Sequence, residues 1–116
     1  MSTKVNRRPR ARQTTPLAAS QQLHERADEA IAVLKAMASH NRLLLLCELV
    51  SGERSVGELA QSLDLAQATV SQHLSLLRRD GVVAGRREAQ TIHYRISDPR
   101  VQALMATLFE QFCSNE

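Results

Sequence analysis

The stretch SVGELAQSLDLAQATVSQHLSLLRRDG, residues 55–81, carries the strongest structural signal in the chain. Ser55 followed three residues later by Glu58 is the pattern of a capping box, which marks the start of a helix. Apolar residues recur at helical spacing on both sides of a break at residues 64–65, and Gly81 ends the second run. Two short helices joined by so tight a turn predict a helix-turn-helix.

After these two helices the apolar period changes from helical to alternating. Residues 82–97, VVAGRREAQTIHYRIS, are typical of two strands joined by a polar turn at residues 88–90. One face of the second strand carries Ile92, Tyr94 and Ile96. The pattern predicts a β-hairpin directly after the helix-turn-helix.

Two more helices are expected before this region. Apolar residues at three- and four-residue steps predict an amphipathic helix over residues 20–38. The polar run SHNR, residues 39–42, suits the cap of a second helix over residues 43–50, which Gly52 closes.

A last helix is expected after the hairpin, with Asp98 as its N-cap and Pro99 at its first position. It carries more apolar residues than one small core can use, and the excess predicts a partner subunit. These residues are Val101, Leu104, Met105, Leu108, Phe109 and Phe112. We therefore predict a mainly α homodimer with a β-hairpin wing, a winged helix-turn-helix of four helices, two strands and a fifth helix.

Charge is unevenly placed along the chain. Residues 1–19 contain five basic residues, two prolines and no acidic residue, which predicts a disordered basic arm before a folded domain over residues 20–116. The arm can bind phosphates non-specifically or merely aid solubility. Because the formal net charge is +3, residues 20–116 sum to −2, so any nucleic-acid surface on the domain has to be local.

The composition also excludes several classes of protein. No apolar run approaches the roughly 20 residues of a membrane span, and no apolar segment follows the basic start as in a secretory signal. We expect a soluble cytoplasmic protein, in which two cysteines form no permanent structural disulfide. No Cys–His–acid arrangement, Gly-rich phosphate loop or pair of metal ligands is present, so no enzymatic activity is expected.

The second helix of the helix-turn-helix presents hydrogen-bonding side chains outside its apolar stripe. Those predicted to face outward are Gln67, Thr69, Ser71, Gln72 and His73. A recognition helix enters the major groove of DNA by its N-terminal half and reads base edges with such groups. Phosphate contacts are expected from arginines of this helix and the hairpin. These are Arg78, Arg86 and Arg87. A solvated face of a protein-interaction module is the alternative, and the arginines together with the basic arm favour DNA.

The run from SHNRLLLLCELVSGERSVGELAQSL to the strand IHYRI resembles the ArsR/SmtB family of dimeric bacterial repressors. The likeness covers residues 20–116, and TVSQHLSLLRRDGVV with IHYRI is its most specific part. The resemblance implies a winged-helix homodimer whose first and last helices pack between subunits. It also implies an inducer that releases DNA. Because the surplus apolar residues of the last helix predict a two-fold dimer, we expect the partner to be double-stranded operator DNA with an inverted repeat.

Many members of this family sense metals, and their ligand positions differ here. Where arsenic and cadmium sensors carry CVCDL, this chain reads SVGEL, so Ser55 and Gly57 replace both thiols. Where zinc sensors place a histidine near the start of the last helix, Arg100 follows Asp98, and that helix has no histidine. Carboxylates alone bind zinc poorly. No metal site and no cofactor are therefore expected.

The two cysteines resemble those of a narrower branch. Cys47, in LCELVSGERSVGEL, and Cys113, in LFEQFCSNE, match the SqrR/BigR branch, whose members sense persulfides and related reactive sulfur. The resemblance implies that a di- or polysulfide bridge joins the pair and releases DNA. Two unrelated thiols, a metal-responsive repressor and a sensor of other oxidants are the alternatives. Burial among leucines should raise the pKa of Cys47 unless His40 or Arg42 offsets it.

Overall fold

The computed structural model describes residues 16–113, which divide into two compact units. The first unit extends to Ala32 and contains α1 (Pro16–Glu25) and the first part of α2 (Ala27–Met37). The second unit begins at Val33 and contains the remaining elements.

The N-terminal region differs from the prediction in two ways. Residues 16–19, expected in the arm, already form the start of α1, while residues 1–15 lie outside the described part of the chain. The single helix predicted over residues 20–38 is divided at Arg26, although the Arg26 N–H still donates to the Gln22 carbonyl at 3.2 Å. The division is therefore a local distortion of a nearly continuous helix.

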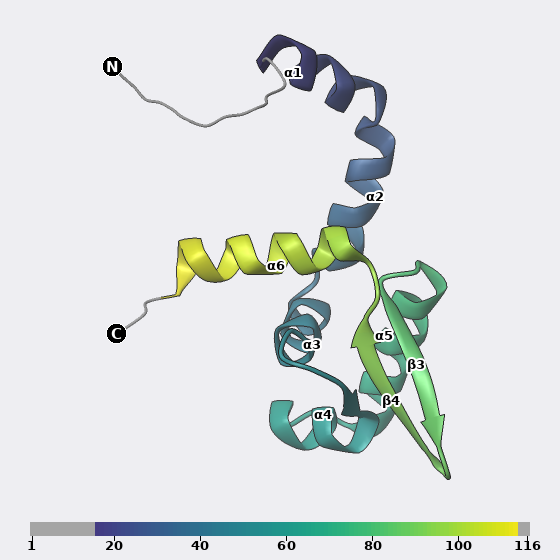
Figure 1. Cartoon of the computed structure of the whole chain (residues 1–116). Helices are drawn as coiled ribbons and strands as arrows, with labels where there is room; N and C mark the ends of the chain where they lie inside the picture. Colours follow the sequence, from purple (N-terminus) through teal and green to yellow (C-terminus); the bar gives the residue numbers. More distant parts are fainter. Residues whose placement is uncertain (1–15, 114–116) are drawn as a thin grey trace. The chain divides into compact units, whose positions relative to one another are not determined.

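The second unit is a winged helix-turn-helix (Figure 1). After α2 come α3 (His40–Leu49), β2 (Arg54–Ser55), α4 (Val56–Leu63), α5 (Gln67–Arg79), β3 (Val83–Glu88), β4 (Thr91–Ile96) and α6 (Pro99–Phe112). The three strands pair antiparallel in the order β2-β4-β3. The predicted mainly α fold with a β-hairpin wing is confirmed, with an additional two-residue strand, β2, that the sequence did not indicate.

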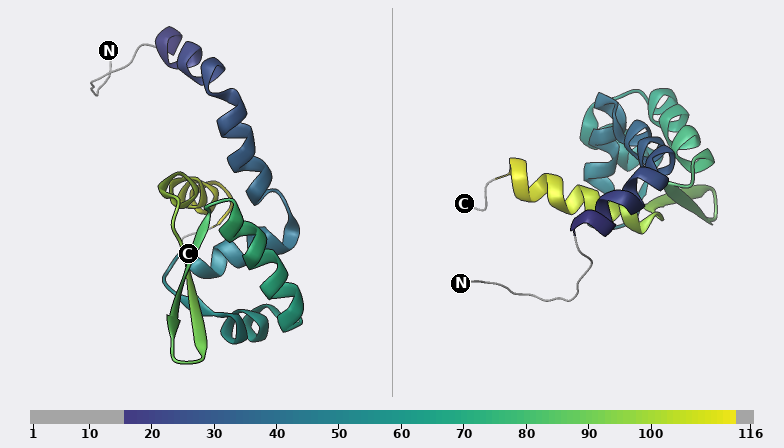
Figure 2. Two further views of the ribbon diagram at one scale, coloured as in Figure 1. Left: turned by 90° about the vertical axis from the view of Figure 1, so that its right-hand side faces the viewer. Right: turned by 90° about the horizontal axis from the view of Figure 1, so that it is seen from above.

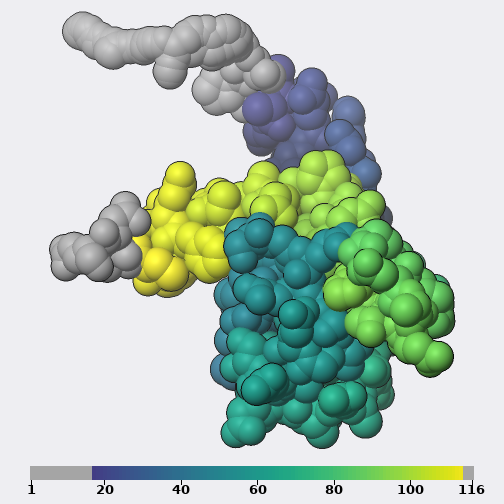
Figure 3. Space-filling model, turned by 60° about the horizontal axis from the view of Figure 1, so that its bottom comes forward, coloured from purple at the N-terminus to yellow at the C-terminus, as the bar shows by residue number. Residues whose placement is uncertain are grey.

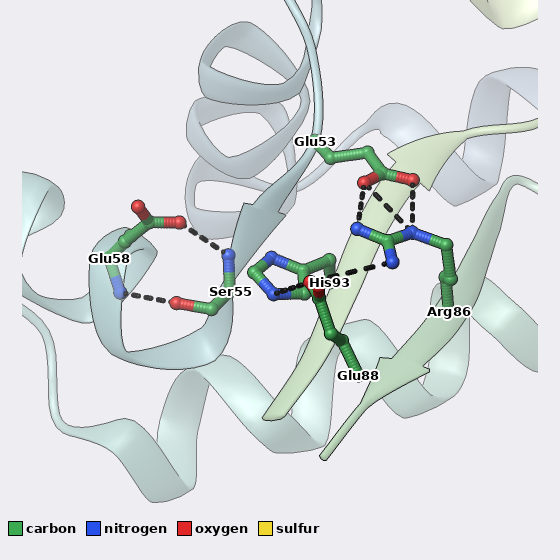
Figure 4. Close-up of polar contacts among 6 residues, drawn as sticks. All are labelled: Glu53, Ser55, Glu58, Arg86, Glu88 and His93. Carbon is green, nitrogen blue, oxygen red and sulfur yellow. Dashed lines mark hydrogen bonds and ion pairs between the residues drawn. The ribbon is translucent and has the colours of Figure 1, made fainter. Parts of the chain in front are cut away.

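Local hydrogen bonds set the ends of the helices as predicted. The Glu58 N–H donates to Ser55 Oγ at 3.1 Å and the Ser55 N–H donates to Glu58 Oε1 at 2.8 Å, which completes the capping box before α4 (Figure 4). Asp98 caps α6 by accepting a backbone N–H at 2.9 Å. Ser39 caps α3 in the same way, so this helix begins three residues earlier than predicted.

The turn between α4 and α5 depends on one left-handed residue. Asp64 has a φ of 55°, and its N–H donates to the carbonyls of Ala60 and Gln61 at the end of α4. Aspartate tolerates this conformation better than most residues do. The tight turn predicted at residues 64–65 is thereby confirmed, and it sets α5 beside α4.

One hydrophobic core joins the elements of the second unit. Its fully enclosed leucines are Leu45 and Leu46 of α3, Leu59 of α4, and Leu74 and Leu77 of α5. Burying each such side chain stabilises the fold by roughly 1.5–3 kcal/mol. No single helix within residues 16–113 is long and apolar enough to cross a membrane. Taken together, the bent pair of α2 and α3 is long and apolar enough by length and composition, but leucines of α3 are buried in this core.

The apolar residues of α2 divide between the core and the surface. Val33, Ala36 and Met37 lie in the core, whereas Ile31 and Leu34 are 47% and 53% exposed. Its apolar residues are too numerous for one side, and the single chain leaves part of them open to solvent.

The arrangement of the second unit brings the wing beside the recognition helix. Figures 1 and 2 show the hairpin of β3 and β4 running alongside α5, with its tip at the end of the unit where α4 lies. The same views show the last turns of α6 extending beyond the helices of the core. The tip of the wing and the start of α5, which follows α4, therefore lie toward the same end of the unit, where one binding partner could contact both.

Adding a side chain at Gly85 is expected to destabilise the fold, because neighbouring side chains pack closely against this glycine. A Cβ there would lie 3.0 Å from Ile92 Cγ2 and 3.3 Å from Tyr94 Cε1, so these side chains would have to move. We expect Gly85→Ala to lower the free energy of unfolding by about 1–3 kcal/mol, the usual cost of overpacking. Gly57→Ala is the matched control, because the nearest atoms there would be 3.9 Å away. Urea denaturation measures both, and equal stability of the two variants would contradict the prediction.

Candidate functional site

The exposed side of α5 carries three of the predicted hydrogen-bonding groups. Gln67, Ser71 and Gln72 are exposed, while the apolar stripe of the same helix faces the core. Within residues 16–113 none of the three makes a side-chain hydrogen bond. The N-cap residue, Ala66, gives the helix no side-chain cap. This side of α5 therefore offers donors and acceptors that the chain itself does not use.

Thr69 and His73 differ from the expectation that they face outward, because both are partly buried. The Nδ1 atom of His73 is enclosed and has no hydrogen-bond partner among the residues described. An imidazole with one nitrogen enclosed has only the other, Nε2, for an external partner. His73 therefore lies at the rim of the exposed polar side rather than in its centre.

The wing has two chemically different faces, because side chains alternate along a strand. In the pairing of β3 with β4, Arg86 lies opposite His93 and Arg87 lies opposite Ile92. Arg86 therefore shares one face with Glu88 and His93, while Arg87 lies on the opposite face with Ile92.

Glu53 forms an ion pair with Arg86 on the face that Arg86 shares with Glu88 and His93 (Figure 4). Arg86 Nη2 donates to Glu53 Oε1 at 2.8 Å, and Nε donates to the same carboxylate at 3.2 and 3.3 Å. Glu88 Oε1 lies 3.5 Å from Arg86 Nη1 and 3.6 Å from His93 Nε2. Hydrogen bonding to Arg86 lowers the pKa of Glu53, and Glu53 in turn raises the pKa of Arg86. The charge of Arg86 is thus partly neutralised by its own chain.

Arg78 and Arg87 differ from Arg86, because neither forms an ion pair with any residue that the structure describes. Both are exposed. They line the same open hollow, of about 440 Å³, between the end of α5 and the wing. The three arginines predicted to contact phosphate therefore divide into one internally paired residue and two unpaired ones.

The two thiols lie in the same unit, one in α3 and one at the end of α6. Cys47 is half-buried against the core, and Cys113 is exposed at the C-cap of α6, where its N–H donates to the Phe109 carbonyl at 3.0 Å. Gln102 Nε2 donates to the Val50 carbonyl at 3.3 Å and so joins α6 to the end of α3. Both cysteines are free thiols in this structure.

The surroundings of Cys47 favour its neutral form. Burial raises the pKa of Cys47 above the ordinary value of 9.0, and negative charge at Cys113 and at Glu48 raises it further. The offset considered for His40 or Arg42 is not realised, because the net shift of the Cys47 pKa is upward.

The carboxylate of Asp98 is engaged within the chain. Asp98 Oδ2 lies 2.8 Å from Arg100 Nη2, and hydrogen bonding to Arg100 lowers the pKa of Asp98. Among the described residues, no group of three or more His, Cys, Asp and Glu side chains could hold a metal ion.

A helix-turn-helix with an exposed polar second helix beside an arginine-bearing wing defines the class of winged-helix DNA-binding regulators. A family model described as "Bacterial regulatory protein, arsR family" matches residues 39–84. The transcriptional activator HlyU of Vibrio cholerae is 45% identical over 93 residues, which cover 80% of this chain and 86% of HlyU. The biofilm growth-associated repressor of Agrobacterium fabrum is 44% identical, with 81% of this chain and 80% of that protein covered. The chain belongs to the arsR family and is a DNA-binding transcriptional regulator.

Solved structures agree with this assignment. Reduced HlyU from Vibrio cholerae has a TM-score of 0.76 at 45% identity, with 81% of this chain and 99% of that chain covered. The transcriptional repressor BigR from Xylella fastidiosa has a TM-score of 0.78 at 38% identity, with 83% and 98% covered. The winged helix-turn-helix of the second unit is therefore a fold shared with regulators of this family.

Glu53 and β2 are features of the site that the sequence did not indicate. A strand of two residues is too short to show a period of two. Glu53 and Arg86 are 33 residues apart, so no local pattern connects them. Their contact depends on the pairing of β2 with β4, which brings the segment before α4 to the wing.

The raised pKa of Cys47 has a measurable consequence. Because the thiolate is the reactive form, alkylation of Cys47 should speed up with pH and reach its half-maximal rate above pH 9.0. Replacing Cys113 by serine removes a negative charge, so the midpoint for Cys47 should move to lower pH. Mass spectrometry of iodoacetamide-treated protein gives both profiles. A midpoint near neutral pH, or one unmoved in Cys113→Ser, would contradict the coupling of the pair.

Proposed function

We propose that this regulator senses reactive sulfur species through Cys47 and Cys113, and that a di- or polysulfide bridge between them releases operator DNA. The observation that carries the proposal is the placement of two free thiols on α3 and at the C-cap of α6, which lie in one unit. The hydrogen bond from Gln102 to the Val50 carbonyl joins the two helices concerned. Similarity to HlyU, whose solved structure is described as the reduced form, supports a redox role.

The chemistry requires a donor of sulfane sulfur, such as an organic persulfide. A cysteine thiolate attacks the outer sulfur of the donor, the donor's S–S bond breaks, and the donor leaves as a thiolate while the cysteine becomes a persulfide. The second thiolate attacks the inner sulfur of that persulfide, and hydrosulfide leaves. The two thiols are thereby oxidised to a disulfide, and the sulfane sulfur is reduced to sulfide. When both cysteines carry a persulfide, the same displacement gives a trisulfide.

The positions of the two thiols suggest an order of reaction. Cys113 is exposed, whereas Cys47 is half-buried with a raised pKa, so we expect Cys113 to accept sulfur first. Cys47 then closes the bridge from the core side. Each inserted sulfur adds about 2 Å of reach, so a polysulfide can join positions that a simple disulfide cannot. Peroxide can give only a simple disulfide, so a bridge that needs additional sulfur atoms would form with sulfur donors and not with peroxide.

The bridge would act on DNA through a homodimer. Phe112 of α6 is 82% exposed and Leu34 of α2 is 53% exposed, as expected for faces that pack against a second subunit. Drawing the end of α6 toward α3 would alter that interface and hence the spacing of the two recognition helices on an inverted repeat. A coupling of about 1–3 kcal/mol is usual for such linked sites.

The DNA surface comprises α5 and the wing. Base edges in the major groove are read by the exposed Gln67, Ser71 and Gln72, with the partly buried Thr69 and His73 at the rim. Phosphates are bound by Arg78 and Arg87, and by Arg86 to the extent that Glu53 releases it.

Gln72→Ala tests the assignment of base reading. It should weaken binding to a selected operator by about 1–3 kcal/mol, because a base-edge contact is lost, and leave binding to a scrambled duplex unchanged. Gln111→Ala, the same substitution on the exposed side of α6, is the control and should change neither. Fluorescence anisotropy with both duplexes measures the difference. An equal loss on both duplexes for Gln72→Ala would show that this residue carries no sequence information.

Cys47→Ser and Cys113→Ser test the switch. After treatment with an organic persulfide, the wild type should lose operator affinity by roughly 5- to 150-fold. Each serine variant should bind DNA before treatment and keep its affinity afterwards, because one persulfide cannot close a bridge. Mass spectrometry should find a species that joins Cys47 to Cys113, and reduction should restore binding by the wild type.

Other outcomes of this experiment separate the alternatives. If Cys113→Ser releases DNA as the wild type does, the bridge is not the switch. Unmodified thiols together with bound zinc would support a metal-responsive regulator. Equal release by peroxide and by persulfide would indicate a general sensor of oxidants.

A further inference from the structure

Cys47 lies in the last turn of α3, where the surroundings disfavour an anion. The helix ends at Leu49, and its last turn contains no basic residue. The C-terminus of a helix carries partial negative charge, which opposes ionisation of a thiol placed there. Glu48 follows Cys47 directly in the helix, with the two Cα atoms about 3.8 Å apart, and adds a carboxylate. Two sources of negative potential therefore meet at one thiol.

A hydrogen bond from α4 holds the side chain of Glu48 in place. Ser62 Oγ donates to Glu48 Oε1 at 2.8 Å. The two helices pack against each other, and Figure 3 shows them as one continuous blue to teal surface beside the yellow surface of α6. Glu48 is only partly exposed, so water and salt screen its charge less than that of a freely moving surface carboxylate. The carboxylate is thus kept beside α3.

The basic groups near α3 do not offset this carboxylate at Cys47. Burial raises the pKa of Cys47 most, and among residues 16–113 the charges of Cys113 and Glu48 raise it further. Arg54 of β2 approaches α3 at its backbone, with Nε 3.5 Å from the Glu48 carbonyl. The basic residues of α3 itself lie in its first turn, at the opposite end from Cys47. Glu48 therefore acts on this thiol without a basic counterpart among the described residues.

A low thiolate fraction affects two reactions of Cys47 differently. A thiolate attacks one oxygen of dissolved hydrogen peroxide, the O–O bond breaks, and a sulfenic acid and hydroxide form. The rate of this bimolecular step falls with the thiolate fraction. A persulfide on Cys113 would instead be presented to Cys47 within the protein, at an effective concentration far above that of a dissolved oxidant. Cys47 can therefore react slowly with peroxide and still close a bridge.

We propose that Glu48, held by Ser62, makes Cys47 slow toward dissolved oxidants and so reserves it for closing the bridge to Cys113. This inference rests on the proposed sensing function and deepens it by naming a residue that sets its selectivity. Glu48 takes no part in the exchange of sulfur. It acts through its charge on the neighbouring thiol, and Ser62 acts by orienting that charge.

The pH dependence of alkylation tests the role of Glu48. Glu48→Gln removes the charge but keeps a side-chain oxygen that accepts the hydrogen bond from Ser62. The full-length reduced protein is treated with iodoacetamide over a range of pH, and mass spectrometry follows the peptide that contains Cys47. We expect the midpoint to move to lower pH in Glu48→Gln. It should move part of the way in Ser62→Ala, because an untethered carboxylate is screened by solvent.

Glu110→Gln is the matched control, because it removes the same charge from the exposed side of α6. It should leave the profile of Cys47 unchanged. The circular dichroism melting curve of each variant establishes that it is folded.

A comparison of two oxidants tests the selectivity. In the Cys113→Ser background, where no bridge can form, hydrogen peroxide should oxidise Cys47 faster when Glu48→Gln is added. With Cys113 present, bridging by an organic persulfide should not speed up by the same factor in Glu48→Gln, because the first step takes place at Cys113.

Three results would overturn the proposal. An unmoved midpoint in Glu48→Gln would show that its charge does not act on Cys47, and an equal movement in Glu110→Gln would show a general effect of charge. Equal acceleration with peroxide and with persulfide would show that Glu48 does not set selectivity. In each case the wild type still forms the bridge, so the sensing function stands. A wild type that forms no bridge would contradict the sensing function itself, while the alkylation profiles would still decide the effect of Glu48 on Cys47.

Discussion

Burial of the leucines of α3 is the constraint on which the rest of the second unit depends. Leu45 and Leu46 are fully enclosed, and α3 packs against α4, α5 and β4. One helix therefore orients both helices of the helix-turn-helix and the central strand of the sheet. Cys47 follows Leu46 directly, so its half-buried position and raised pKa are consequences of the packing that forms the core. The proposed sensor and the core that positions the DNA-binding elements share one helix.

Two arginines of the wing carry the same charge but lie in different surroundings. Arg86 and Arg87 are adjacent in sequence, but alternation along β3 sends them to opposite faces. Arg86 meets Glu53, whose carboxylate accepts three hydrogen bonds from it, whereas Arg87 meets a hollow without an acid. An exposed ion pair such as that of Arg86 contributes little to the stability of the fold, because water screens it. Its main effect is to tie the wing to the segment before β2 and to neutralise part of the charge of Arg86.

The N-terminal helices show what apolar periodicity in the sequence cannot predict. Apolar spacing predicted one amphipathic helix over residues 20–38, of which the chain buries Val33, Ala36 and Met37 and leaves Ile31 and Leu34 exposed. Periodicity identifies an apolar face, but it does not say whether that face packs on the same chain or on another molecule. The exposed residues of α2 and of the end of α6 are those for which this distinction matters most.

The elements that could be read from the sequence are those whose causes lie within a few residues. The capping box of Ser55 and Glu58, the Asp98 cap and the alternation of β4 each depend on neighbours close along the chain. Resemblance added the proposed pairing of Cys47 with Cys113, which no local pattern supplies. The pairing of β2 with β4, the bond from Glu53 to Arg86 and the enclosure of His73 Nδ1 appeared only in the folded chain. These contacts join segments far apart in sequence, and their formation depends on how the whole core packs.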